Sequence, residues 1–449
     1  METKKKGFPA AFWVCACTEI FERLAYYLGR SLILIFVTAS VATGGLGLSD
    51  TVAANMQSNL TAFSYLLPLF GAVIVDKYIG ARYTTPVGMF IAAAGYFTGG
   101  IAKSSVGVYA MIFLVSLGLA LFKNGAIIGR VITDKSQMDP AFSMRYTLVN
   151  VGAFIGTFLV GILYKDVFAK DGVLGFAPCF KMAALMMVLG GLWYIFVCWR
   201  FLGDLGKLPF KKTLTEEEKA AEAKKKEETG TKQPLTTIEK KRIGAIFVAS
   251  LFSIVFWIFW YLGYMPVYFY WAENMDWVVA GYQVPSTWFD AANSLFCVIL
   301  GPVTAALWKK LAARPQGDMS LFRKTGLGIA IIGVGYLFYA AIDILRGGEK
   351  ASVLWLIVFA FLLTMGEMFF SPLGHSFISK YSPSRYLAVM MSVWGFATFI
   401  AAKSYGPVYG LLFGGKIEFK VACIGVAVVS FAAALIMIAL DKKLSALVD

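Results

Sequence analysis

Charged residues are scarce in this chain. Of its 449 residues only 15% are Asp, Glu, Lys or Arg, whereas a soluble globular chain has about 25%. Hydrophobic residues make up 59% of the chain, and its mean hydropathy is +0.70. This balance excludes a soluble enzyme and a nucleic-acid-binding domain.

The chain also lacks the residue clusters from which metal and catalytic sites are built. It has one histidine, His375, and its six cysteines show no metal-binding spacing. Neither a phosphate-binding G-x-x-x-x-G-K-[ST] loop nor a nucleophile–base constellation occurs. We therefore expect no cofactor, no metal and no enzymatic activity. We interpret the cysteines as small buried hydrophobic residues.

Long apolar runs are abundant. A transmembrane helix takes about 20 mainly apolar residues, and these runs are continuous instead of alternating as in a β-barrel. They predict an all-α integral membrane protein with twelve transmembrane helices. The runs fall at roughly 8–38, 51–75, 83–101, 107–129, 141–164, 178–200, 243–270, 285–308, 322–343, 352–379, 386–412 and 418–440.

A polar segment, 203–242, divides these runs into six and six and cannot span a membrane. We predict an N-terminal six-helix bundle over 1–202, a cytoplasmic linker over 203–242 and a C-terminal six-helix bundle over 243–449. Within the linker, Thr215 and Glu218 have the spacing of a capping box, which predicts a short surface helix.

The formal charge of +14 predicts the orientation. Lys and Arg collect in the cytoplasmic loops of polytopic proteins. With the N-terminus in the cytoplasm, most basic residues fall in segments on that side, with or without the linker. We therefore expect a multi-pass protein of the inner cell membrane with both termini cytoplasmic, lipid as its surroundings and no nucleic-acid partner.

The first run contains charges that lipid would not tolerate. Two acids, two bases and two tyrosines share one broad face of this span: Glu19, Glu22, Arg23, Arg30, Tyr26 and Tyr27. Intramembrane charges are costly, face the bundle interior and usually pair. A purely structural ion-pair network is the alternative, although apolar residues would join helices at lower cost.

The same segment resembles the E-x-x-E-R-F-x-Y-Y signature of the proton-dependent oligopeptide transporter (POT) family, with Leu24 in place of Phe. The stretch 366–374, GEMFFSPLG, resembles that family's G-E-L-x-x-S-P-x-G-L. Weaker resemblances occur at 65–82, 121–123, 146–153 and 390–394, so both halves are covered. The resemblance implies the major facilitator fold, whose two six-helix halves rock about a site near the bilayer midplane. It also implies a proton-coupled symporter that imports di- or tripeptides or peptide-like molecules.

The residues themselves fit a peptide, whose ammonium and carboxylate are separated by a distance set by its backbone. Arg23 and Lys123 would bind the carboxylate through charge-assisted hydrogen bonds. Glu367 would bind the ammonium, helped by Asn150 and Asn293. The resemblance implies the same roles, and it adds residues that line the cavity: Tyr26, Tyr27, Tyr65, Trp257, Ser371 and Trp394.

A second set of residues is predicted to couple protons or to gate the transporter: Glu19, Glu22, Arg30, Asp76, Arg82, Asp290 and Lys403. Asp76 and Arg82 lie at the cytoplasmic end of the 51–75 run, where a carboxylate and a base can latch two helices together. Ordinary loop charges are the alternative for this pair.

Some positions depart from the family pattern. An acid is usual in the run that begins at 243, where this chain has Tyr261. Asp290 and Lys403 are charges in the 285–308 and 386–412 runs that the family pattern does not contain. Asp290 could pair with Arg30, and Lys403 with Glu367 when substrate is absent. The alternative is that both lie at the outer water interface.

Two other functions stay open. The same fold could transport a modified peptide or an anion, or the chain could be a receptor that senses peptides and signals through 203–242 without transport. We expect peptide and protons as ligands and a monomeric protein.

Overall fold

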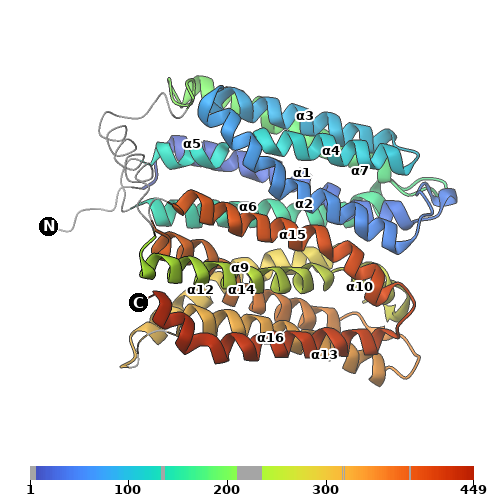
Figure 1. Ribbon diagram of the computed structural model, residues 1–449. Coiled ribbons are helices and arrows are strands. Elements are labelled where there is room, and N and C mark those ends of the chain that lie inside the picture. The colour runs from blue at the N-terminus through green and yellow to red at the C-terminus, as the bar shows by residue number, and fades with distance from the viewer. Residues whose placement is uncertain are drawn as a thin grey trace. The chain divides into compact units, whose positions relative to one another are not determined.

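The computed structural model describes residues 7–132, 137–209, 235–315, 317, 319–383 and 386–448. Within these residues the chain is mainly helical, and its long helices fall on the twelve predicted apolar runs (Figure 1). Eight of the described helices are long and apolar enough to cross a membrane by length and composition. Their outward side chains are often large and apolar, as at Phe113, Leu251 and Leu435, which suits contact with lipid.

The chain packs as two compact units. Unit 1 comprises Met1–Leu48 and Leu66–Leu214, and unit 2 comprises Ser49–Tyr65 and Thr215–Asp449. The helix α2 (Asp50–Lys77) therefore gives its first part to unit 2 and its last part to unit 1. The predicted boundaries at 202 and 242 stay predictions.

The described residues of unit 1 form six helices besides the end of α2. Helix α1 packs against α5, α6 and α7, and α3 packs against α4, α5 and α7. Close approach of α3 and α4 depends on glycine, because a Cβ on Gly118 would lie 2.4 Å from the Gly88 carbonyl oxygen. The helices are α1 (Ala10–Thr38), α3 (Ala81–Ile101), α4 (Ser105–Leu121), α5 (Asn124–Val131), α6 (Met138–Ile162) and α7 (Phe176–Arg200), with a 3-10 turn at Val41–Thr43 and a π-helical turn at Leu163–Val167.

One predicted helix is broken. The run 107–129 forms α4 and α5, and Phe122 and Lys123 leave the helical conformation between them. The Lys123 backbone N–H instead donates to Thr85 Oγ1 on α3, at 3.3 Å. The neighbouring helix thus supplies a partner for a backbone group that the break would otherwise leave without one.

Unit 2 contains the second set of long helices. Helix α13 packs against α14 and α16, α9 against α15 and α16, and α12 against α14. The helices are α9 (Thr237–Leu262), α10 (Met265–Tyr268), α11 (Tyr270–Asn274), α12 (Trp288–Ala312), α13 (Leu321–Leu345), α14 (Trp355–Tyr381), α15 (Leu387–Phe413) and α16 (Phe419–Val448). Four two-residue strands lie in the connections: β1 (Met275–Asp276) pairs in parallel with β4 (Ala351–Ser352), and β2 (Val278–Val279) pairs antiparallel with β3 (Tyr282–Gln283).

A capping box starts α9. The Thr236 hydroxyl accepts from the Glu239 backbone N–H, and the Glu239 carboxylate accepts from the Thr236 backbone N–H. The capping box predicted at Thr215 and Glu218 lies outside the described residues.

Candidate substrate and proton sites in the two units

The charges of α1 are paired within unit 1. Glu22 is fully buried and forms an ion pair with the neighbouring Arg23. The Arg23 guanidinium also lies 4.8 Å from the centre of the Tyr26 ring, which suits a cation–π contact. The Arg23 side chain is 25% exposed, so it remains accessible while the acid that binds it is not.

Glu19 joins three helices. Its Oε1 accepts from Arg145 Nε on α6 at 2.9 Å and from Asn124 Nδ2 on α5 at 3.1 Å. Asn124 Nδ2 also donates to the Cys15 carbonyl oxygen at 2.8 Å. The sequence analysis did not select Arg145 or Asn124. Arg145 lies two turns inside α6, since this helix begins at Met138.

The other predicted residues of this unit have local partners. Lys123 Nζ donates to the Pro68 carbonyl oxygen at 2.8 Å. Asn150 Nδ2 donates to the Tyr146 carbonyl oxygen of its own helix, at 3.0 Å. Arg30 is buried and its guanidinium lies 5.9 Å from the centre of the Tyr27 ring.

Arg82 holds the end of α7. It donates to the Cys198 carbonyl oxygen at 2.6 Å and to the Gly203 carbonyl oxygen. A cation at the last carbonyls of a helix is favourable for the helix dipole. The side chain of Asp76 lies outside the described part of the structure, so the predicted latch between Asp76 and Arg82 stays a prediction.

Unit 2 holds a buried acid, Glu367, on α14. The carboxylate is 9% exposed, and its Oε2 accepts from Asn293 Nδ2 on α12 at 3.3 Å. Asn293 Nδ2 also donates to Thr364 Oγ1 at 2.8 Å, and the Cys297 thiol donates to Glu367 Oε2 at 3.8 Å. The sequence predicted Glu367 and Asn293, whereas Thr364 and Cys297 gave no signal among the apolar residues around them.

Aromatic rings form a wall in the same unit. Trp257 contacts Tyr261 and Phe370 with ring centres 5.8 and 6.0 Å apart. Trp394 stacks on Phe370 at 5.9 Å and lies against Gly374. The Ser371 side chain is outside the described part of the structure.

Tyr261 occupies the position where the family pattern has an acid. Its hydroxyl donates to the Tyr65 hydroxyl at 3.1 Å, and its ring stacks on Tyr405 at 5.0 Å. A phenol that donates to another phenol thus stands where the family pattern has a carboxylate.

The two additional charges lie in different surroundings. Asp290 is 5% exposed, and its carboxylate accepts from the Tyr268 hydroxyl, so it is not at an open water interface. Lys403 is exposed and donates to the Asn59 side-chain oxygen, whereas Glu367 is bound by Asn293. Next to this contact the Ser58 hydroxyl donates to the Ala402 carbonyl oxygen at 2.7 Å, which ties the first part of α2 to α15.

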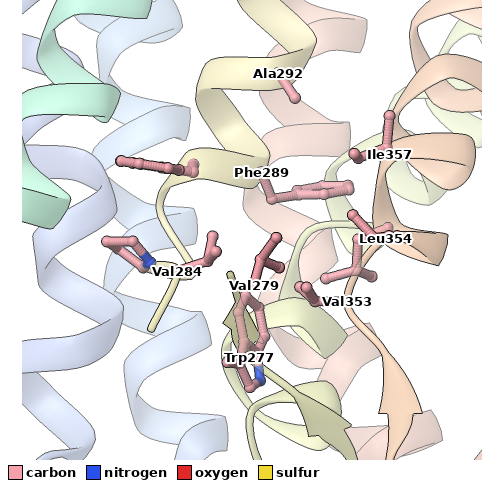
Figure 2. Close-up of a pocket in the computed structure, with 11 residues that line it drawn as sticks. Trp277, Val279, Val284, Phe289, Ala292, Val353, Leu354 and Ile357 are labelled. Carbon is pink, nitrogen blue, oxygen red and sulfur yellow. The ribbon is translucent and has the colours of Figure 1, made fainter. Parts of the chain in front are cut away.

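A separate cavity of about 300 Å³ opens beside the start of α12 (Figure 2). Trp277, Phe289, Leu354 and Ile357 line it with other apolar residues, and no charged residue is among the described residues around it. It offers nothing to the charged ends of a zwitterion, so we do not assign it to the substrate.

Comparisons with known proteins find relatives among transporters. A model of the POT family matches residues 199–413. The di-/tripeptide transporter of Lactococcus lactis subsp. cremoris is 24% identical over 440 residues, covering 86% of this chain and 86% of the relative. The uncharacterized transporter YclF of Bacillus subtilis (strain 168) is 25% identical over 439 residues, covering 89% of this chain and 87% of the relative.

Solved structures show the same fold. A peptide transporter POT in complex with sulfate has a TM-score of 0.87 at 22% identity, covering 99% of this chain and 98% of that one. A POT family transporter in complex with 5-aminolevulinic acid has a TM-score of 0.85 at 23% identity, covering 98% of each chain. The chain therefore has the same fold as these POT family transporters. The chain is similar to the POT family, through a family model over residues 199–413 and through relatives over most of its length.

Proposed function

We propose that this chain is a proton-coupled symporter that imports di- or tripeptides, or peptide-like molecules, by alternating access. The observation that carries the proposal is Glu367, a buried acid held by Asn293. Such a carboxylate binds an ammonium strongly because little water competes for it. Two similar proteins are named di-/tripeptide transporters.

Unit 1 contains two basic residues that could bind the carboxylate end of a peptide. Arg23 and Lys123 are candidates for the substrate carboxylate, and each now has a partner inside the protein. Protonation of Glu22 would cancel its attraction for Arg23 and release the guanidinium to a substrate carboxylate. Proton binding and substrate binding would then favour each other, which is the linkage that symport requires.

A second cargo class has support of its own. One structural neighbour was solved with 5-aminolevulinic acid, and another with a thioalcohol-conjugated peptide. A small molecule with an ammonium and a carboxylate, but without a peptide bond, would meet the same residues.

The cellular setting is part of the proposal. We place the chain in the inner cell membrane as a monomer, with both termini in the cytoplasm. The excess of basic residues on that side supports this orientation.

Uptake by the purified protein in liposomes tests the function. A dipeptide library, with 5-aminolevulinic acid beside it, is offered with the outside more acidic than the lumen. We expect accumulation of dipeptides that disappears when the pH gradient is collapsed. Peptide binding without uptake would favour the receptor, and uptake of 5-aminolevulinic acid alone would favour the second cargo class.

A further inference from the structure

Helix α12 turns a polar face toward Glu367. Asn293 and Cys297 are four residues apart on α12 and therefore lie one above the other on the same face. Both contact the same atom, Glu367 Oε2, at 3.3 Å from Asn293 Nδ2 and 3.8 Å from Cys297 Sγ. Cys297 is 3% exposed, so bulk water does not replace this contact.

The amide in this group is fixed independently of the acid. Asn293 Nδ2 also donates to Thr364 Oγ1, which itself donates to the Ala360 carbonyl oxygen at 2.8 Å. Thr364 lies one turn before Glu367 on α14. The Asn293 side chain is thus held from α14, and the thiol adds a second donor to the carboxylate oxygen that the amide contacts.

The residues around the Cys297 sulfur show how a hydrogen-bonding role can be separated from a packing role. Cys297 packs with Leu300 and Met368, which form a small apolar cluster around it. An apolar side chain of similar volume would satisfy that cluster equally well. Only a side chain that donates would also hold Glu367, because a thiol is a weak hydrogen-bond donor and a carboxylate is a strong acceptor.

We propose that Cys297 is a positioning residue: together with Asn293 it holds the Glu367 carboxylate in the orientation that receives the ammonium group of the substrate. The proposal rests on the proposed function, in which Glu367 binds that ammonium. It assigns a role in substrate recognition to a thiol that the sequence presents as one more apolar residue. It predicts that loss of the thiol weakens recognition of ligands with a free amino end, and leaves recognition of ligands with a blocked amino end unchanged.

Three variants separate donation from packing. Cys297→Val removes the donor and keeps an apolar side chain, Cys297→Ser keeps a donor, and Cys423→Val removes a buried thiol of α16 in the same unit. In proteoliposomes, counterflow of a labelled dipeptide is competed with the free dipeptide and with its N-acetylated form. Cys297→Ala, measured in the same way, serves if the valine variant does not reconstitute.

For Cys297→Val we expect the KM for the free dipeptide to rise about threefold to tenfold, which corresponds to the loss of one hydrogen bond. The maximal rate and the competition by the N-acetylated form should stay unchanged. Cys297→Ser and Cys423→Val should match the wild type. An unchanged KM in Cys297→Val, or equal losses for the free and the blocked dipeptide, would overturn the proposal. If wild-type protein took up no dipeptide, the proposed function itself would fail, and the assignment of Cys297 with it.

Discussion

Glu22 forms an ion pair with Arg23, the residue that follows it in the chain. The acid is fully buried whereas the base is partly exposed, so the guanidinium is the accessible group of the pair. A proton on Glu22 would release that cation, which makes this pair the simplest candidate for the switch that couples a proton to a substrate carboxylate.

The first prediction concerns this switch. Glu22→Gln should abolish gradient-driven accumulation of dipeptide in proteoliposomes, because the glutamine can no longer gain or lose a proton. Counterflow, which needs no net proton movement, should remain in part. Glu418→Gln, at an exposed acid paired with Lys420, is the matched control and should leave both activities unchanged. Accumulation against a gradient by Glu22→Gln would show that another group carries the proton.

The second prediction concerns Lys123. Lys123 lies at the break between α4 and α5, and its ammonium donates to the Pro68 carbonyl oxygen. Lys123→Ala should weaken dipeptide binding by about 2–5 kcal/mol if the lysine and the substrate carboxylate form a buried pair. A dipeptide amidated at its C-terminus should lose most of that difference. Competition binding measures both ligands, and equal losses for the two would give Lys123 a structural role.

The third prediction concerns Asp290. It is buried, bound by the Tyr268 hydroxyl and one turn before Asn293 on α12. An intramembrane acid of this kind marks a functional site. Asp290→Asn should therefore reduce gradient-driven uptake more than counterflow. Asp441→Asn is the control, because Asp441 is equally buried at 5% but pairs with Arg323. Full uptake by Asp290→Asn at every pH tested would leave Asp290 as a charge that favours the start of α12.

The fourth prediction concerns stability. A Cβ on Gly374 would lie 2.1 Å from Trp394 Cζ2, so alanine there must displace the indole. Gly374→Ala should lower the free energy of unfolding by about 1–3 kcal/mol, as overpacking does, and lower the Tm. Gly301→Ala is the control, because a Cβ there meets nothing within 4 Å and should leave the Tm equal or higher. Equal Tm values for the two variants would contradict the tight contact.

The positions of the long helices could be predicted because hydropathy over about 20 residues is a local property. The break at Lys123 could not, since no proline marks it and its backbone partner, Thr85, lies on another helix. For the same reason Glu19, Glu367 and Asn293 could be predicted, whereas the other residues that bind these two acids could not. Charges in an apolar run are conspicuous, whereas Asn124, Thr364 and Cys297 become recognisable only when packing brings them to a carboxylate.

The most direct test of symport follows proton and peptide together. Proteoliposomes that contain the wild-type protein and a pH-sensitive dye in the lumen are given a dipeptide without any imposed gradient. Symport predicts that the lumen acidifies as labelled dipeptide enters, and that Glu367→Gln and protein-free liposomes show neither change. Dipeptide entry without acidification would contradict the account.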